Sequence, residues 1–279
     1  MAGFNPETTI KYDLAMPSAM PPSTGPGLPP CHPVSPLRRA VAAVMALLLA
    51  VFLPGPARAT ETPVDLQLVL AIDASNSVSD ARFELQKQGY VAAFRNPQVI
   101  KAIASGGEQS IAVTMMQWTG PFTHVQVVPW MLVKGTAAAH ALADAIAQTE
   151  RELWGGSGTS ISGAINQGVV LLSQSPYKSQ RRTIDISGDG ANSSGRSVIR
   201  ARDDAVAQGI GINGLPILSI DRGLDRYFYN YVIGGPGAFM IPAENYENFA
   251  EAIVKKLILE IAANPPPPGP WGAVLARNP

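Results

Sequence analysis

An apolar stretch that ends in a carboxylate and two hydroxyls places the strongest constraint on the fold. Residues 66–77 read LQLVLAIDASNS, with apolar side chains at both odd and even positions up to Ile72. A strand that is apolar on both faces is typical of the centre of a parallel sheet covered by helices on each side. Asp73, Ser75 and Ser77 follow at alternate positions, and α/β proteins bind ligands at this carboxyl end of their strands. The stretch therefore predicts a central strand that leads into a binding site.

Strand and helix patterns alternate through the rest of the chain. Strand patterns cover 109–119, 124–133, 182–187, 210–220 and 239–242. Helical spacing covers 82–94, 97–104, 136–151, 160–172, 197–208, 224–232 and 246–262. Gly120-Pro121 separates the first two of these strands, which predicts a hairpin and an antiparallel edge strand. The alternation predicts an α/β fold, a doubly wound and mainly parallel, Rossmann-like sheet with helices on both faces.

The first 59 residues have the pattern of a leader and an export signal. Residues 1–37 contain nine prolines without periodicity, which predicts disorder. Residues 38–59 form a signal peptide pattern, with Arg38-Arg39, an apolar run over 40–53 and an Ala57-Arg58-Ala59 end. This run is shorter than the roughly 20 residues of a membrane-spanning helix. We therefore expect cleavage after Ala59 and a periplasmic or secreted protein without a stable membrane span, with an uncleaved anchor as the alternative.

The remaining chain is long enough for one domain, over 64–262, followed by a proline-rich tail over 263–279. The formal net charge is zero, with 21 basic and 21 acidic residues. Removing residues 1–59 takes away four basic and two acidic side chains and leaves 17 against 19. This balance argues against nucleic acid as a partner. A single cysteine, Cys31, and three scattered histidines argue against a thiolate or histidine metal site.

Three segments bring oxygen-bearing side chains to one edge of the predicted sheet. The first gives Asp73, Ser75 and Ser77, a glycine loop before the helix over 160–172 gives Thr159, and the strand over 182–187 leads to Asp189. Sites made of oxygen ligands alone suit hard cations such as Mg²⁺, Mn²⁺ or Ca²⁺. Two carboxylates only formally neutralise a dication, and hydroxyls are weak donors. Such an ion would keep an open position for an acidic group of a partner.

The order of these residues resembles the metal-ion-dependent adhesion site (MIDAS) of von Willebrand factor type A domains, and the resemblance covers residues 64–262. It implies a mainly parallel sheet with one short antiparallel edge strand, a non-enzymatic function and a metal ion. The implied metal ligands are Asp73, Ser75, Ser77, Thr159 and Asp189. Three further segments are similar to an uncharacterised bacterial family of secreted proteins with this domain: GTSISGAI (158–165), DISGDG (185–190) and GGPGAF (234–239).

Some of these residues also have a simpler structural interpretation. Asp73 could be a turn or helix-capping carboxylate, and Thr159 could be a helix cap whose place as oxygen donor is taken by Ser157 or Ser160. Asp185 lies in the middle of a predicted strand, where a buried carboxylate needs partners. We expect it to be an ordinary buried aspartate, with support of the neighbouring site as the alternative.

The leading functional hypothesis is an exported binding module that captures an Asp or Glu side chain of a protein partner through a bound cation. The alternative is a metal-dependent phosphohydrolase of the haloacid-dehalogenase type, which also combines an Asp at a strand end with a later Gly-Asp-Gly. Such an enzyme needs a second Asp as general acid where this chain has Ser75, and another where it has Ser193. A structural domain with an unused metal site is the third hypothesis.

Overall fold

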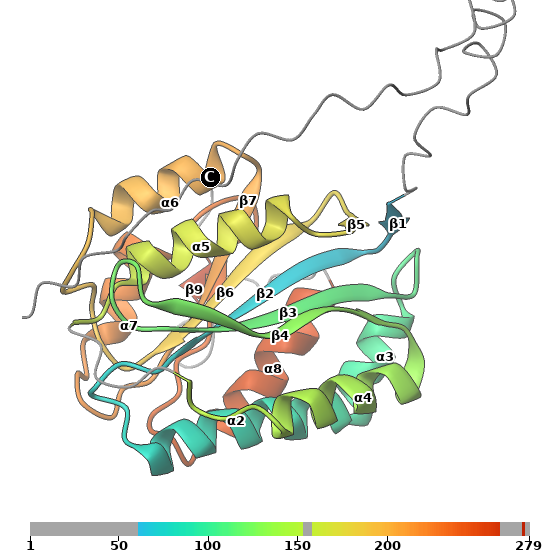
Figure 1. Cartoon of the computed structure of the whole chain (residues 1–279), viewed down its shortest axis with the longest axis horizontal. Helices are drawn as coiled ribbons and strands as arrows, with labels where there is room; N and C mark the ends of the chain where they lie inside the picture. The colour runs from blue at the N-terminus through green and yellow to red at the C-terminus, as the bar shows by residue number, and fades with distance from the viewer. Residues whose placement is uncertain (1–60, 153–157, 263–274, 277–279) are drawn as a thin grey trace, which may run out of the picture. The chain divides into compact units, whose positions relative to one another are not determined.

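The central sheet has the arrangement that the apolar stretch predicts. The computed structural model describes residues 61–152, 158–262 and 275–276, so the predicted leader, signal peptide and proline run lie outside the described residues. In the described part, β2 (Leu66–Asp73) lies inside a seven-stranded sheet of order β4-β3-β2-β6-β7-β8-β9 (Figure 1). The other strands are β3 (Ile111–Trp118), β4 (His124–Val133), β6 (Arg182–Gly188), β7 (Ile210–Pro216), β8 (Phe239–Met240) and β9 (Leu275–Ala276).

The strand directions confirm the mainly parallel sheet. β3, β2, β6, β7 and β8 run parallel, and β4 pairs antiparallel with β3 as the predicted hairpin. At the opposite edge β9 pairs antiparallel with β8, within the stretch predicted to be a tail. A separate two-stranded parallel sheet joins β1 (Thr62–Pro63) to β5 (Tyr177–Lys178), which the sequence did not indicate.

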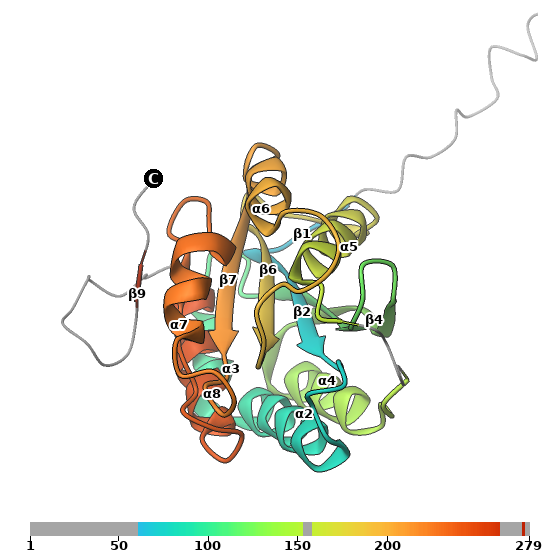
Figure 2. The ribbon, with the colours of Figure 1, turned by 90° about the vertical axis from the view of Figure 1, so that its left-hand side faces the viewer.

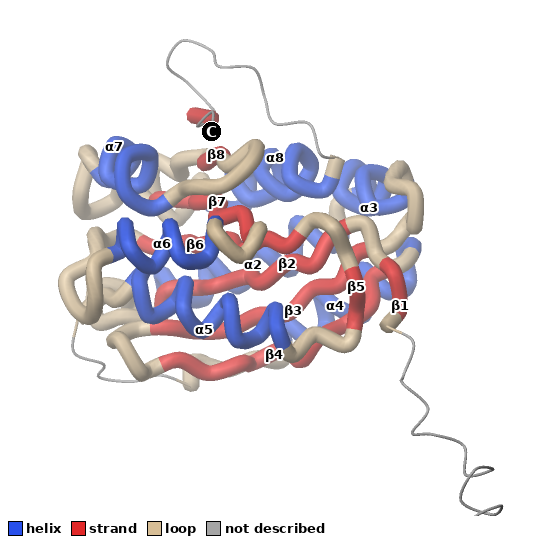
Figure 3. The backbone as a smooth tube through the Cα atoms, turned by 90° about the horizontal axis from the view of Figure 1, so that it is seen from above, coloured by secondary structure: helices blue, strands red, loops and turns tan. Residues whose placement is uncertain are grey.

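The alternating side chains of β2 feed two separate apolar cores. Leu66, Leu68, Leu70 and Ile72 belong to one core, and Val69 and Ala71 belong to the other. The first core includes α2 (Asp80–Arg95), α3 (Pro97–Ala104), α4 (Gly135–Ala147) and α8 (Phe249–Ile261). The second includes α5 (Ile161–Ser173), α6 (Val198–Val206), α7 (Leu224–Tyr227) and the π-helical turn η1 (Phe228–Val232). Figures 2 and 3 show these helices on the two sides of the strands.

Three predicted elements differ from the structure by three or four residues at one end, and the others by smaller amounts. The helix predicted over 136–151 ends at Ala147, and Gln117 then holds the chain in a non-helical path through the carbonyl of Glu150 and the amide of Glu152. The strand predicted to continue to Ile220 ends at Pro216. The last helix begins at Phe249 rather than Tyr246, whose ring instead reaches the end of β6.

A buried ion cluster holds α8 against the sheet. The Asp185 side chain in mid-strand of β6 has no exposed surface, and Lys256 Nζ lies 2.7 Å from its Oδ1. The same Nζ lies 2.9 Å from Glu260 Oε2, one helical turn further along α8. Burial by itself lowers the pKa of Lys256, but the charges of Asp185 and Glu260 outweigh it and raise the pKa above its ordinary value. Asp185 is thus a buried structural carboxylate.

The edge strand β4 is irregular in its middle. Val113 of β3 pairs with Met131, whereas Met115 pairs with Val128, so two residues of β4 face the single residue Thr114. Pro129 is one of these two and is exposed. Proline lacks the N–H group that a further strand would need, and bulges of this kind are typical of strands at the border of a sheet.

Candidate metal-binding site

The predicted site residues lie at the carboxyl edge of the sheet. β2 and β6 are parallel neighbours, with Ile72 opposite Ser187, and their arrows end at the same edge of the sheet (Figure 2). Asp73 is the last residue of β2 and Asp189 directly follows β6, so both lie at this edge. Both carboxylates are almost fully buried, with exposed fractions of 0% and 1%. The parallel pairing therefore brings together two acidic residues that are far apart in the sequence.

Serine hydroxyls connect the two carboxylates. The amide of Ser75 donates to Asp73 Oδ1 over 2.7 Å, and the hydroxyls of Ser75 and Ser77 lie 3.0 Å apart. The Ser77 hydroxyl donates to Asp189 Oδ1 over 2.6 Å. Four of the five predicted ligands thus form one continuous cluster, in which Ser77 is the exposed member.

The fifth residue, Thr159, lies beside this cluster. Its hydroxyl is 3.5 Å from the position that a Cβ atom on Gly190 would occupy. The neighbouring Ser160, and not Thr159, caps α5, since its hydroxyl accepts from the amide of Gly163 over 3.1 Å. Ser157, the other alternative donor, lies outside the described residues. The preceding Gly158 has a φ of +87°, a conformation that favours glycine and so explains the glycine loop before the helix.

Asp73 combines a turn function with an unpartnered oxygen. Its Oδ1 forms the turn to the Ser75 amide that the simpler interpretation predicted, but its buried Oδ2 has no hydrogen-bond partner among the described residues. A Cβ atom on Gly188 would come within 2.8 Å of this oxygen, so only glycine leaves room for it. Burial raises the pKa of Asp73 to about 7 against the opposing hydrogen bonds of Ser75, and the negative charge of Asp189 adds to the rise.

Three residues that the sequence did not single out complete the surroundings. The Tyr246 hydroxyl donates to Asp189 Oδ2 over 2.8 Å, and Arg82 Nη1 lies 3.9 Å from the same oxygen. Arg151 donates from Nη2 to the carbonyls of Ala74 and Ser75 over 2.9 and 3.1 Å, and its Nη1 pairs with Asp80. These contacts span up to 107 positions in the chain, and no local pattern marks them in the sequence.

The donor set fits a hard divalent cation. It consists of two carboxylates and three hydroxyls, and the buried, unpartnered Asp73 Oδ2 is a group that a cation would stabilise. No group of three or more His, Cys, Asp or Glu side chains in the described ranges is arranged to hold a metal. A metal at this edge would therefore depend on the hydroxyls, and the two carboxylates would do no more than neutralise it.

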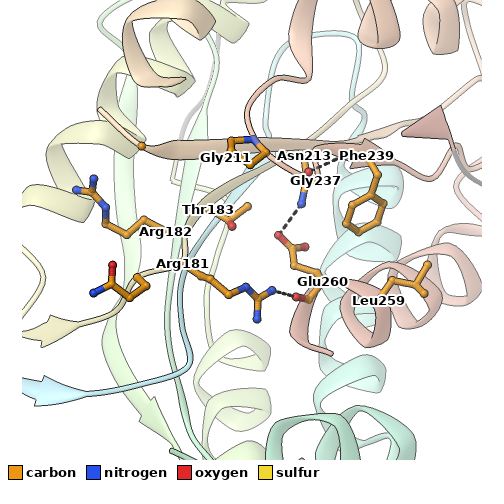
Figure 4. A pocket seen from close by; sticks show the side chains of 12 residues that line it. Arg181, Arg182, Thr183, Gly211, Asn213, Gly237, Phe239, Leu259 and Glu260 are labelled. Atoms are coloured by element: carbon orange, nitrogen blue, oxygen red, sulfur yellow. Dashed lines mark hydrogen bonds between the residues drawn. The ribbon is translucent and has the colours of Figure 1, made fainter. Parts of the chain in front are cut away.

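A cavity of about 200 Å³ lies at the opposite edge, where β6 and β7 begin (Figure 4). Its most buried charged and amide groups have partners: Asn213 Nδ2 donates to Glu260 Oε1 over 3.0 Å, and Arg181 donates to the backbone carbonyl of Glu260. Arg182 donates to the carbonyl of Gln208 beyond the end of α6. The two arginines thus bind carbonyls at helix ends, and this cavity offers no unpartnered group comparable to Asp73 Oδ2.

The chain has the von Willebrand factor A-like fold that the resemblance implied, and solved structures share this fold. Proximal thread matrix protein 1 from the mussel byssus, solved with a zinc-occupied MIDAS motif, superimposes with a TM-score of 0.52 at 13% identity, over 72% of this chain and 49% of that one. The pilus adhesin SpaC from Lactobacillus rhamnosus GG superimposes with a TM-score of 0.50 at 14% identity, over 74% of this chain and 31% of that one. The chain thus spans half or less of the length of these proteins.

Residues 63–265 match the family described as "Protein of unknown function (DUF1194)", and the chain belongs to this family. No curated protein matches the sequence. At these identities the solved structures show a shared fold, and one protein of this fold holds a divalent metal in its MIDAS. The comparisons indicate no enzyme family. No helix in the described ranges is long and apolar enough to cross a bilayer.

Proposed function

We propose that this protein is an exported binding module that holds a divalent cation, Mg²⁺ or Mn²⁺ in the first place, and captures an acidic side chain of a protein partner through it. One observation carries the proposal: Asp73, Ser75, Ser77 and Asp189 form a continuous cluster of oxygens in which a buried carboxylate oxygen has no partner. Thr159 is the fifth ligand, from the loop next to Gly190.

The charge of the site explains why an acidic group would follow the cation. The two carboxylates balance the two positive charges, and the hydroxyls add none, so the cation keeps most of its attraction for another oxygen. Mg²⁺ binds few protein ligands and retains waters, one of which a carboxylate of the partner replaces. The predicted signal peptide over 38–59 and the extracellular sources of the two similar structures support an exported location.

Calorimetric titration with Mg²⁺ and Mn²⁺ tests the cation. Asp73→Ala removes the carboxylate of the cluster whose buried Oδ2 has no hydrogen-bond partner in the described part of the chain, so we expect the affinity to fall by more than about 100-fold. Asp144→Ala is the matched control, because Asp144 is an exposed carboxylate on α4 that pairs with Arg95. Equal heats from the wild type and from Asp73→Ala would refute the metal assignment.

Capture from an envelope extract tests the partner. We expect a protein that is retained by the wild type, released by EDTA and not retained by Asp73→Ala. A phosphatase assay with Mg²⁺ tests the enzymatic alternative, since turnover that Asp73→Asn abolishes would contradict a non-enzymatic function.

A further inference from the structure

Arg82 is fixed beside the oxygen cluster by three contacts. It is the third residue of α2, and its Nη1 donates to the carbonyl of Ser77 over 3.0 Å. The same nitrogen lies 3.9 Å from Asp189 Oδ2, and the guanidinium carbon lies 5.3 Å from the centre of the Tyr246 ring. Contacts to three separate segments hold the guanidinium in one place, which a surface arginine would not need for solubility alone.

The guanidinium lies at the surface above a buried carboxylate. The Arg82 side chain is 38% exposed, whereas that of Asp189 is fully buried. Its hydrogen bond and ion pair within the described residues both use Nη1. A guanidinium carries five N–H donors in a planar fork, so those of Nη2 and Nε are available to an acceptor that arrives from solvent.

The net charge of the site explains why the position of Arg82 matters. With a dication, Asp73 and Asp189 make the site neutral, and Arg82 adds one positive charge that no further acidic ligand of the cluster balances. A carboxylate that approaches the cation therefore meets a second cation with free donors in fork geometry. We propose that Arg82 is the second anchor for the partner's acidic group, which is held by the bound metal and by the guanidinium together.

This inference rests on the proposed function, and it makes the site selective for an anion. A neutral oxygen donor such as an amide could replace a water on the metal, but it would gain little from Arg82, because its oxygen carries no net charge. The kind of partner that fits is thus a protein segment with an exposed Asp or Glu side chain.

The inference predicts opposite changes in two affinities. The charge of Arg82 repels the metal and attracts the carboxylate, so Arg82→Gln should tighten Mn²⁺ binding by about threefold to tenfold and weaken carboxylate binding by a similar factor. A role limited to holding the Ser77 carbonyl predicts that both affinities fall. The direction in which the Mn²⁺ affinity changes therefore distinguishes a role of Arg82 in binding the carboxylate from a role in holding the Ser77 carbonyl.

Water-proton relaxation of the Mn²⁺ complex measures both affinities with one probe. Manganese titration gives the metal affinity, and acetate, added at constant ionic strength with chloride, lowers the relaxation rate when it replaces a metal-bound water. Arg95→Gln is the matched control, since Arg95 lies in the last turn of the same helix and pairs with Asp144 instead. We expect this variant to match the wild type. Arg82→Lys keeps the charge without the fork, so its metal affinity should stay unchanged while its acetate affinity falls.

The outcomes distinguish a failure of the proposed metal-binding function from a failure of the proposed role of Arg82. If the wild type binds no Mn²⁺, the proposed function fails and the inference fails with it. If Mn²⁺ binds and acetate displaces water equally in the wild type and in Arg82→Gln, only the inference is overturned. A loss of both affinities in Arg82→Gln and Arg82→Lys also overturns it and leaves Arg82 as a residue that positions the Ser77 loop.

Discussion

The charge of Asp73 is unfavourable in the metal-free protein. The carboxylate is fully buried, and only its Oδ1 has a hydrogen-bond partner in the described part of the chain. The groups around the site are Asp189 at the end of β6, Arg82 on α2, Tyr246 before α8, and Arg151 with its partner Asp80. Their net charge does not compensate for burial, which raises the pKa of Asp73 from 3.8 to about 7.

This shift predicts that the metal-free protein loses stability as the pH rises. Between about pH 4 and pH 7 folded Asp73 keeps a proton that the unfolded chain has released, so the free energy of unfolding falls with rising pH. The loss reaches about 4 kcal/mol above pH 7 and is absent below pH 4. Asp73→Asn lacks this contribution.

Urea unfolding in EDTA at pH 4.5 and pH 8 checks the prediction. We expect Asp73→Asn to gain on the wild type by about 3 kcal/mol between these two pH values, because about 1 kcal/mol of the loss has already occurred at pH 4.5. The difference between the two proteins cancels other titrating groups, among them the buried Asp185. Parallel pH profiles of the two proteins would contradict it.

At the scale of elements, Lys256 holds α8 on β6. It faces two buried carboxylates, Asp185 and Glu260, over 2.7 and 2.9 Å. Lys256→Met removes the positive charge and leaves both carboxylates buried without it, so we expect the free energy of unfolding to fall by about 3–5 kcal/mol. The neighbouring Lys255→Met is the control, because Lys255 is exposed and forms a surface pair with Glu251, which contributes about 0–1 kcal/mol. Similar losses in the two variants would refute the importance of the buried cluster.

The elements also show what the sequence could predict. The two-sided apolar pattern of residues 66–72 is local, and it correctly predicted β2, its parallel neighbours and two helix layers. The doubly wound sheet then explains how Asp73 and Asp189 reach one edge, which is where the structure has them. The parallel pairing of the strands thus accounts for most of the fold and for the cluster of candidate ligands.

What the sequence did not predict depends on contacts between distant residues. Tyr246 has the spacing of a helix start, but its hydroxyl bonds to Asp189, 57 positions earlier, and α8 begins three residues later. Lys256 lies on the buried face of α8, at helical spacing from Ala252 and Ile253, and its partner Asp185 is 71 positions earlier in the sequence. The strand β9 follows the proline run in the sequence and pairs antiparallel with β8. None of these partners is encoded within a local window.

At the scale of the whole molecule, the carboxyl ends of the strands and the outer strand β4 differ in what they can bind. The carboxyl edge carries the oxygen cluster and Arg82, and the lateral edge strand β4 carries the bulge with the exposed Pro129. An edge strand with free N–H and C=O groups can pair with another molecule, and bulges and prolines prevent this.

Replacement of Pro129 should therefore change self-association. Pro129→Val supplies an N–H group and a side chain that favours strands, so we expect faster aggregation on prolonged incubation, measured by light scattering. Pro129→Lys supplies the same N–H group together with a charge, and it should remain as soluble as the wild type. Unchanged scattering from Pro129→Val would show that the bulge alone protects this edge.

The resistance of β4 to pairing also affects how copies of this domain associate at high concentration. Neighbouring copies do not pair along β4 into a continuous sheet, so the oxygen cluster of each copy stays accessible. Many such domains at high concentration would then offer many separate binding sites instead of one shared fibre.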